Sequence, residues 1–157
     1  AERGKPLQFA ALLQIGGCGG ELYRPFMIAP RTGHMEKLWT VSRDCCLLER
    51  ELLRKGTPCS QVAWAIHQEQ VKQGVQKYVY NRPAHGQGME GHQPPYIALG
   101  DHTPLDTGMC LSAEPALFDP ESGVGVNFSD MFVVEPAGPA LQMSRLPWCE
   151  EWAWMQL

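Results

Sequence analysis

The feature that most constrains the fold is a glycine-rich segment that carries two histidines and ends in two prolines. It reads His85-Gly86-Gln87-Gly88-Met89-Glu90-Gly91-His92-Gln93-Pro94-Pro95. Further along, residues 108–115 predict an apolar strand that ends in Glu114, directly before a proline. A histidine and a carboxylate on such neighbouring segments can place an acid and a base in one cleft. Alone, the histidine fits an ordinary turn and the glutamate a charge at a strand end; together they predict a site.

Length and composition predict one globular domain, residues 1–157, with 44% apolar and 19% charged residues. A net charge of −4 without a cluster of lysine or arginine argues against a nucleic-acid partner. The apolar runs, such as residues 9–13, are too short to span a membrane. No export signal is visible, which predicts a cytoplasmic location. The first residue is Ala1 rather than methionine, so the sequence leaves open whether an upstream segment was removed.

The six cysteines predict free thiols rather than a metal site or disulfides. Cys45 and Cys46 are neighbours that cannot easily pair, and no Cys-x-x-Cys spacing occurs. Mostly buried thiols in a reducing compartment are therefore expected. Disulfides in an exported protein are the alternative, which the absent signal disfavours.

The N-terminal part predicts a hairpin. An apolar run at 9–15 predicts a largely buried strand, the glycines within 16–20 predict a turn, and residues 23–29 predict the returning strand. A phosphate-binding loop is the alternative for these glycines, but no Lys-Ser or Lys-Thr follows them.

Two helices and several short strands are predicted after the hairpin. Apolar residues spaced three and four apart predict an amphipathic helix over 32–55, and a second helix, capped by Ser60, reaches Val71. Strands are predicted at 75–80, 108–114, 124–130, 131–135 and, more weakly, 140–143. Trp148, Trp152 and Trp154 are expected to close the core or an interface; a stacking surface for sugars or bases is the alternative.

Four elements in order resemble the pita-bread fold of methionine aminopeptidase, aminopeptidase P, prolidase and creatinase. Where the family has Asp-x-x-Arg-Thr-Phe, this chain has Glu21-Leu22-Tyr23-Arg24-Pro25-Phe26, and Lys55-Gly56-Thr57-Pro58 stands between the two helices. The family pattern His-Gly-x-Gly-x-x-x-His-x-x-Pro is matched at every position by residues 85–95, and Gly-Met-x-x-x-x-Glu-Pro by residues 108–115. The resemblance spans about residues 13–147 and implies an α+β fold, a curved antiparallel sheet backed by helices.

The peptidases of this family hold two metal ions with two aspartates, one histidine and two glutamates. The resemblance places the histidine at His85, the first glutamate at Glu114 and the second aspartate at Glu21. The first aspartate is replaced by Gln14 and the second glutamate by Ser129. Since neither replacement is charged, a pair of metal ions is not expected, nor is any other cofactor.

Creatinase implies that this fold can work without metal. The catalytic candidates are then His85, His92 and Glu114, and the substrate-binding candidates are Glu21, Arg24, Gln14 and Ser129. In this hypothesis His85, near its unperturbed pKa of ~6.5, activates water or takes a substrate proton. The glutamates bind a cationic or amide nitrogen, His92 helps to hold the substrate, and Arg24 binds a substrate carboxylate. The expected reaction is hydrolysis or C–N cleavage of a small amide, guanidino or amino-acid-derived substrate.

Two other functions stay open: a non-catalytic binding or scaffold subunit, and a lyase or single-metal variant that uses His85, Glu114 and Glu21. The resemblance also covers only the later of the two related halves of the pita-bread domain. A half-sheet with exposed apolar edges is a poor monomer. We therefore expect the missing half from a cleaved upstream fragment, a separate subunit or a symmetric mate.

Overall fold

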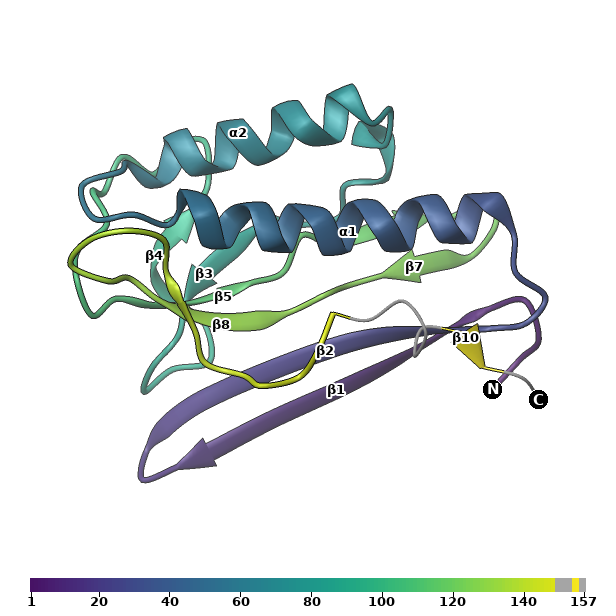
Figure 1. The fold of residues 1–157 in the computed structure, drawn as a ribbon, viewed down its shortest axis with the longest axis horizontal. Coiled ribbons are helices and arrows are strands. Elements are labelled where there is room, and N and C mark those ends of the chain that lie inside the picture. The colour runs from purple at the N-terminus through teal and green to yellow at the C-terminus, as the bar shows by residue number, and fades with distance from the viewer. Residues whose placement is uncertain (149–153, 156–157) are drawn as a thin grey trace.

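Two helices, α1 (Gly33–Leu52) and α2 (Cys59–Lys72), lie together on one side of a mostly antiparallel set of strands (Figure 1). The computed structural model describes residues 1–148 and 154–155. A long hairpin extends on the side away from the helices (Figure 1). It consists of β1 (Pro6–Ile15) and β2 (Cys18–Ile28). The arrangement is the α+β architecture that the sequence predicts.

The central sheet has five strands in the order β4-β3-β5-β8-β9, all paired antiparallel. Its strands are β3 (Ala84–Gly86), β4 (Gln93–Ile97), β5 (Cys110–Ala113), β8 (Asp130–Val133) and β9 (Leu141–Gln142). A separate pair is formed by β6 (Leu117–Asp119) and β7 (Val124–Val126), and β10 (Trp154–Met155) pairs in parallel with β2. The strands β3, β4, β6 and β10 were not predicted: β3, β6 and β10 have only two or three residues, and β4 contains two prolines.

The turn of the hairpin uses two of the four glycines that the sequence assigns to it. Gly16 and Gly17 have φ values of 60° and 85°, as a two-residue type I′ turn requires. The other two glycines lie within β2. Of these, Gly19 donates its backbone N–H to the carbonyl of Gly88 at 2.7 Å, which brings β2 against the segment that contains the two histidines.

The strand predicted at 9–15 exists, but the prediction that it is largely buried is wrong. β1 is the edge of its sheet, and its side chains are mostly exposed. Because side chains alternate along a strand, Leu7, Phe9, Leu13 and Ile15 share one face. Their exposed fractions are 41%, 50%, 65% and 78%. The described part of this chain therefore leaves the apolar face of β1 uncovered.

Both predicted helices are present. Thr32 caps α1 by accepting a hydrogen bond from the backbone N–H of Met35. The predicted cap of α2 is wrong: the cap position is Pro58, and the hydroxyl of Ser60 instead lies 3.0 Å from Nδ1 of His102. The strand predicted at 75–80 is also wrong, because a 3-10 helix, Gln76–Tyr78, occupies this segment.

Two of the three C-terminal tryptophans pack against the core, as predicted. Trp148 and Trp154 are partly buried hydrophobic residues in contact with the core cluster. Trp152 lies outside the described residues. In the described part of the chain no helix is long and apolar enough to cross a membrane. The cysteines described there, Cys18, Cys45, Cys46, Cys59 and Cys110, are all free, as expected.

Candidate active site

His85 lies on β3, in the interior of the five-stranded sheet, and not in the ordinary turn that the histidine alone would fit. It pairs with Tyr96 on β4 and with Ser112 on β5, and it is fully buried. The β3–β4 register shifts directly after His85, where Gly86 approaches the partner strand. A Cβ at Gly86 would lie 2.6 Å from the carbonyl oxygens of residues 93 and 94. The absence of a side chain at Gly86 thus permits the strand pairing that holds His85.

Substituting Gly86 with alanine should destabilise the protein by about 1–3 kcal/mol, because the new methyl group overpacks two backbone carbonyls. Gly91→Ala is the matched control, since its Cβ would meet nothing within 4 Å. The free energy of unfolding, measured with denaturant, should fall for the first variant and stay within about 0.5 kcal/mol for the second. Equal effects of both substitutions would contradict the close approach of β3 and β4.

Two carboxylates meet the imidazole of His85. Glu21 on β2 places Oε1 at 3.1 Å from Nε2, and Glu114, just after β5, places Oε1 at 3.0 Å from the same atom. Both glutamates are buried, with exposed fractions of 5% and 7%. The ring of His92 lies 4.0 Å from the ring of His85, centroid to centroid. The structure thus brings together four of the seven candidate side chains, His85, His92, Glu21 and Glu114; their roles stay predictions.

The protonation of His85 differs from the sequence-based expectation. Its Nδ1–H donates to the carbonyl of Gly86 at 3.0 Å, so Nε2 faces the two carboxylates, although neither oxygen is placed to complete a hydrogen bond with it. Burial alone would lower the pKa of His85, but the contacts with Glu114 and Glu21 outweigh it and raise the pKa to about 9. In the metal-free protein His85 is therefore a cation at neutral pH, and it starts as an acid rather than as the expected base.

The second oxygen of Glu21 is held by Tyr23, whose Oη donates to Oε2 at 3.0 Å. Burial raises the pKa of Glu21, but the contacts with His85, Ser112 and Tyr23 and the charge of His85 outweigh burial, so the net shift of the pKa is downward. Burial and the neighbouring Glu21 raise the pKa of Tyr23. Glu21 is therefore a carboxylate, and Tyr23 remains a protonated donor.

The raised pKa of His85 predicts a pH-dependent stability of the metal-free protein. Its unfolded-state pKa is about 6.5 and its folded-state pKa about 9, so this contribution is fully present below pH 6.5 and is lost as the pH rises to 9. The shift corresponds to up to about 3 kcal/mol. Denaturant unfolding at a series of pH values should show this loss, and His85→Gln should remove it. An unchanged profile in that variant would contradict the ion-pair arrangement.

Gln14 and Ser129 do not contact His85. Gln14 is exposed near the hairpin turn, and its amide lies 3.5 Å from the carbonyl of Gly17, at the rim of a cleft of about 320 Å³ that His92 also lines. The Ser129 hydroxyl is buried and lies 3.0 Å from the hydroxyl of Ser112. The structure therefore allows a substrate-binding role at the rim for Gln14, whereas Ser129 belongs to the floor of the site.

Arg24 lies on the other face of β2 from Glu21, because their separation of three residues reverses the side-chain direction. Its guanidinium contacts Oδ2 of Asp130 at 2.7 Å, donates to the carbonyl of Ser129 at 2.7 Å, and stacks 4.3 Å from the ring centroid of Trp148. The prediction that Arg24 binds a substrate carboxylate is therefore replaced by a structural role. Asp130, whose carboxylate contacts Arg24, also faces away from His85.

Sequence reasoning missed three polar residues of the site: Tyr23, Ser112 and Asn127. Tyr23 follows Glu21 by two positions on one strand, so strand alternation could have placed it on the same face. Ser112 precedes Glu114 by two positions in the same way. Asn127, whose amide lies 3.5 Å from Oε2 of Glu114, carried no signal, because the break between β7 and β8 is not visible in the sequence.

The residues do not fit the pair of metal ions that the family resemblance implies. The side chain directly opposite Glu21 is Leu12, and the next position on that face of β1 is Gln14, so β1 offers no anionic ligand. At the position of the second glutamate, Ser129 is uncharged and its hydroxyl forms a hydrogen bond with the hydroxyl of Ser112. Two hard dications need several carboxylates to offset their charge. A smaller set does fit one ion, because ligand atoms of His85, His92 and Glu114 lie within 4.8 Å of one another.

Comparisons with known proteins agree with the fold. The sequence profile described as metallopeptidase family M24 matches residues 1–136. A Xaa-Pro dipeptidase of Lactobacillus delbrueckii subsp. lactis is 30% identical over 107 residues, which is 68% of this chain and 29% of that protein. A probable dipeptidase, PepE, of Mycobacterium bovis is 26% identical over 141 residues, 87% of this chain and 37% of that protein.

Solved structures show the same fold. The prolidase from Pyrococcus horikoshii superposes with a TM-score of 0.87 and 17% identity over 93% of this chain and 42% of its own. Dipeptidase PepE from Mycobacterium ulcerans superposes with a TM-score of 0.84 and 23% identity, over 97% of this chain and 40% of its own. The chain thus spans less than half the length of these relatives, and it has the α+β pita-bread fold. It belongs to the metallopeptidase family M24.

Proposed function

We propose that this site cleaves an amide or related C–N bond of a small, amino-acid-derived substrate by acid–base catalysis, without a pair of metal ions. The observation that carries the proposal is the buried imidazole of His85 between Glu21 and Glu114, with His92 beside it. The names of the relatives, which are dipeptidases, support a peptide-like substrate. The uncharged Gln14 and Ser129 support the absence of a metal pair.

His85 and Glu114 supply the acid and the base in this proposal. Glu114 takes a proton from water as the water oxygen bonds to the substrate carbonyl carbon. As the C–N bond breaks, protonated His85 donates its Nε2 proton to the leaving nitrogen. Glu114 then returns its proton to His85 across the 3.0 Å that separates them, which restores the starting state. The products are a carboxylic acid and an amine, so one water is consumed for each bond that is cleaved.

Glu21 and His92 bind and orient in the same proposal. The side chains of Glu21, Glu114 and protonated His85 carry a combined charge of −1, which matches one substrate ammonium group. Glu21 is held by Tyr23 and stays a carboxylate throughout. His92 is exposed at the mouth of the site, where it can contact the substrate.

Hydrolysis in the presence of a strong chelator tests the proposal. The assembled protein is dialysed against the chelator and offered dipeptides and amino-acid amides at neutral pH. Release of a free amine at an unchanged rate is expected. Loss of activity in the chelator, recovered with two equivalents of a divalent ion, would overturn the proposal. Absence of turnover for every amide, before and after ion addition, would instead favour the binding or scaffold function.

A single-ion hydrolase or lyase is the second candidate, favoured by the ligand atoms of His85, His92 and Glu114 within 4.8 Å of one another. His85 donates a hydrogen bond from Nδ1–H to the carbonyl of Gly86, and a contact of this kind commonly orients a metal-bound histidine. A bound ion would supply a Lewis acid at this point. Activity that requires one equivalent of ion, and no more, would favour this candidate.

We further propose that the exposed edge and apolar face of β1 are covered by the other half of a pita-bread domain. The face of Leu7, Phe9, Leu13 and Ile15 is exposed, and β1 is the edge strand of its sheet. Leaving such a face in water costs roughly 25 cal/mol for each Å² of apolar surface. The chain also spans less than half the length of its relatives.

Sedimentation of the isolated chain tests the covering of β1. We expect self-association or aggregation, and a stable complex when a chain with the other half is supplied. An upstream segment, a separate subunit and a second copy of this chain are distinguished by the mass of the native complex. A well-folded monomer of 17.5 kDa with a cooperative melt would contradict the proposal.

A reducing, cytoplasmic location is proposed from the thiols. The cysteines that the structure describes are free, and burial raises the pKa of Cys45 and Cys59, to about 12 and about 11. Such thiols stay protonated and unreactive at neutral pH. Recovery of the tagged protein in an exported fraction would contradict this location.

A further inference from the structure

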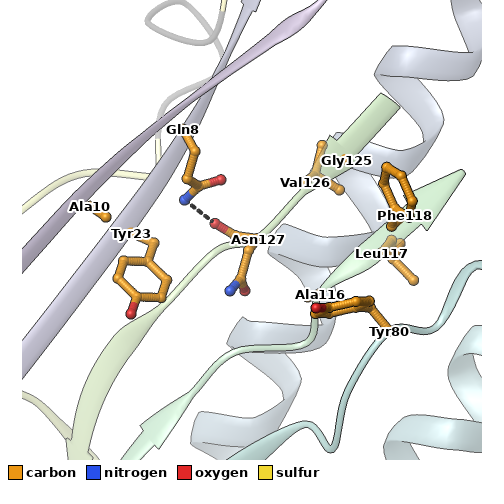
Figure 2. Close-up of a pocket in the computed structure, with 10 residues that line it drawn as sticks. All are labelled: Gln8, Ala10, Tyr23, Tyr80, Ala116, Leu117, Phe118, Gly125, Val126 and Asn127. Atoms are coloured by element: carbon orange, nitrogen blue, oxygen red, sulfur yellow. Dashed lines mark hydrogen bonds between the residues drawn. The ribbon is translucent and has the colours of Figure 1, made fainter. Parts of the chain in front are cut away.

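A cleft of about 500 Å³ opens between the hairpin and the β6–β7 pair (Figure 2). Its lining is mainly apolar and aromatic, and it contains no charged side chain. The apolar and aromatic members are Ala10, Tyr23, Tyr80, Ala116, Leu117, Phe118 and Val126, and the polar ones are Gln8 and Asn127. Figure 2 shows Tyr23 on the hairpin side and Tyr80 and Phe118 on the opposite side, with Asn127 between them.

This cleft adjoins the acid–base site through two of its lining residues. Tyr23 donates its hydroxyl to Glu21, and the Asn127 amide nitrogen lies 3.5 Å from Oε2 of Glu114. A ligand in the cleft therefore contacts two residues, Tyr23 and Asn127, that in turn contact the carboxylates flanking His85. The smaller cleft at the hairpin turn also reaches the site, because Glu21 and His92 line it.

Asn127 carries an unused acceptor at the boundary between the cleft and the carboxylates. Its Oδ1 is buried and has no hydrogen-bond partner among the described residues, whereas its backbone carbonyl accepts from the Gln8 amide at 2.8 Å. A buried polar atom without a partner costs about 1–3 kcal/mol, and a ligand N–H would remove that cost. Because Asn127 lies next to Glu114, the hydrogen-bond donor to its Oδ1 would be an N–H group at the polar end of the substrate.

We propose that this cleft is the specificity subsite of the enzyme and that it binds an uncharged, bulky apolar side chain of the substrate, preferably an aromatic one. Tyr23, Tyr80 and Phe118 supply the ring contacts, and Asn127 Oδ1 accepts an N–H from the substrate backbone. The inference rests on the proposed function for the identity of the polar end. Beyond that function, the inference specifies which class of substrate side chain lies beside the reacting bond.

Binding of two amino-acid amides, phenylalaninamide and glycinamide, tests the subsite without requiring turnover. Isothermal titration of the assembled protein should give roughly 10- to 100-fold tighter binding of phenylalaninamide, the effect of burying one aromatic side chain. Ala10→Trp fills the cleft from an exposed strand position and should reduce this ratio to about threefold or less. Ala137→Trp, on an exposed loop outside the lining, is the matched control and should leave the ratio unchanged.

A second variant keeps the test independent of any folding defect at Ala10. Tyr80 is 74% exposed, so Tyr80→Ala should fold normally and still lower the ratio by roughly threefold through the lost ring contact. Equal affinity for the two amides, or a ratio that neither substitution changes, would overturn the subsite. A preference for phenylalaninamide that Ala10→Trp removes, in a protein that hydrolyses no amide, would support the subsite while the proposed reaction fails.

Discussion

His85→Gln should lower kcat for amide hydrolysis by about 10²- to 10⁴-fold with a smaller change in KM, because it removes the proton donor to the leaving nitrogen. Glutamine keeps a polar side chain but cannot be protonated at Nε2, so the ion pairs with Glu21 and Glu114 are lost as well. The kcat of the wild type should also fall as the pH rises through about 9, where His85 loses its proton. Steady-state kinetics over pH 6–10 measure both effects.

His67→Gln is the control for His85→Gln. His67 lies on α2, where its ring contacts Trp64. The proposed reaction gives His67 no role. This substitution should change kcat by less than about twofold. A His85 variant with near wild-type kcat, or a large effect on KM alone, would show that His85 only binds the substrate.

Arg24→Met should destabilise the protein by about 3–5 kcal/mol, because it leaves the buried carboxylate of Asp130 without its cation. The two side chains have exposed fractions of 9% and 0%. Asp130 keeps neutral partners in Ser144 and Gln142, but these do not neutralise its charge. Denaturant unfolding of the wild type and the variant measures the loss.

Two further variants test this reading of Arg24. The double variant Arg24→Met with Asp130→Leu should recover much of the lost stability, because no buried charge remains unpaired. Arg54→Met removes an arginine that is 51% exposed and pairs with the exposed Glu51, so it should change stability by less than about 1 kcal/mol. A mild effect of Arg24→Met together with a large loss of substrate affinity would return Arg24 to its predicted role in substrate binding.

The order of the main elements along the chain could be predicted from sequence patterns. The motif at residues 85–95, the two helices and the hairpin each carry a local signal, and their sequence in the chain predicts the pita-bread topology. The strands that were missed, such as β6 (Leu117–Asp119), are too short to show alternation. The exposure of β1 could not be predicted, because an apolar run does not indicate whether its cover belongs to the same chain.

Four members of the site could be predicted, but their chemistry could not. His85, Glu21 and Glu114 come from elements far apart in the chain, and motif matching brings them together without giving a distance. The raised pKa of His85 depends on two contacts of about 3 Å, which only coordinates supply. Arg24 belonged to a matching motif, yet its place on the far face of β2 changes its role.

The number of divalent ions bound per chain tests the central claim most directly. The assembled protein is purified from medium that contains zinc, manganese and cobalt, and elemental analysis is paired with an activity assay before and after chelation. The acid–base account predicts no stoichiometric ion and unchanged activity in the chelator. One ion per chain would favour the single-ion candidate at His85, His92 and Glu114. Two ions per chain, with activity that the chelator abolishes, would contradict the account and return this site to the two-metal peptidases.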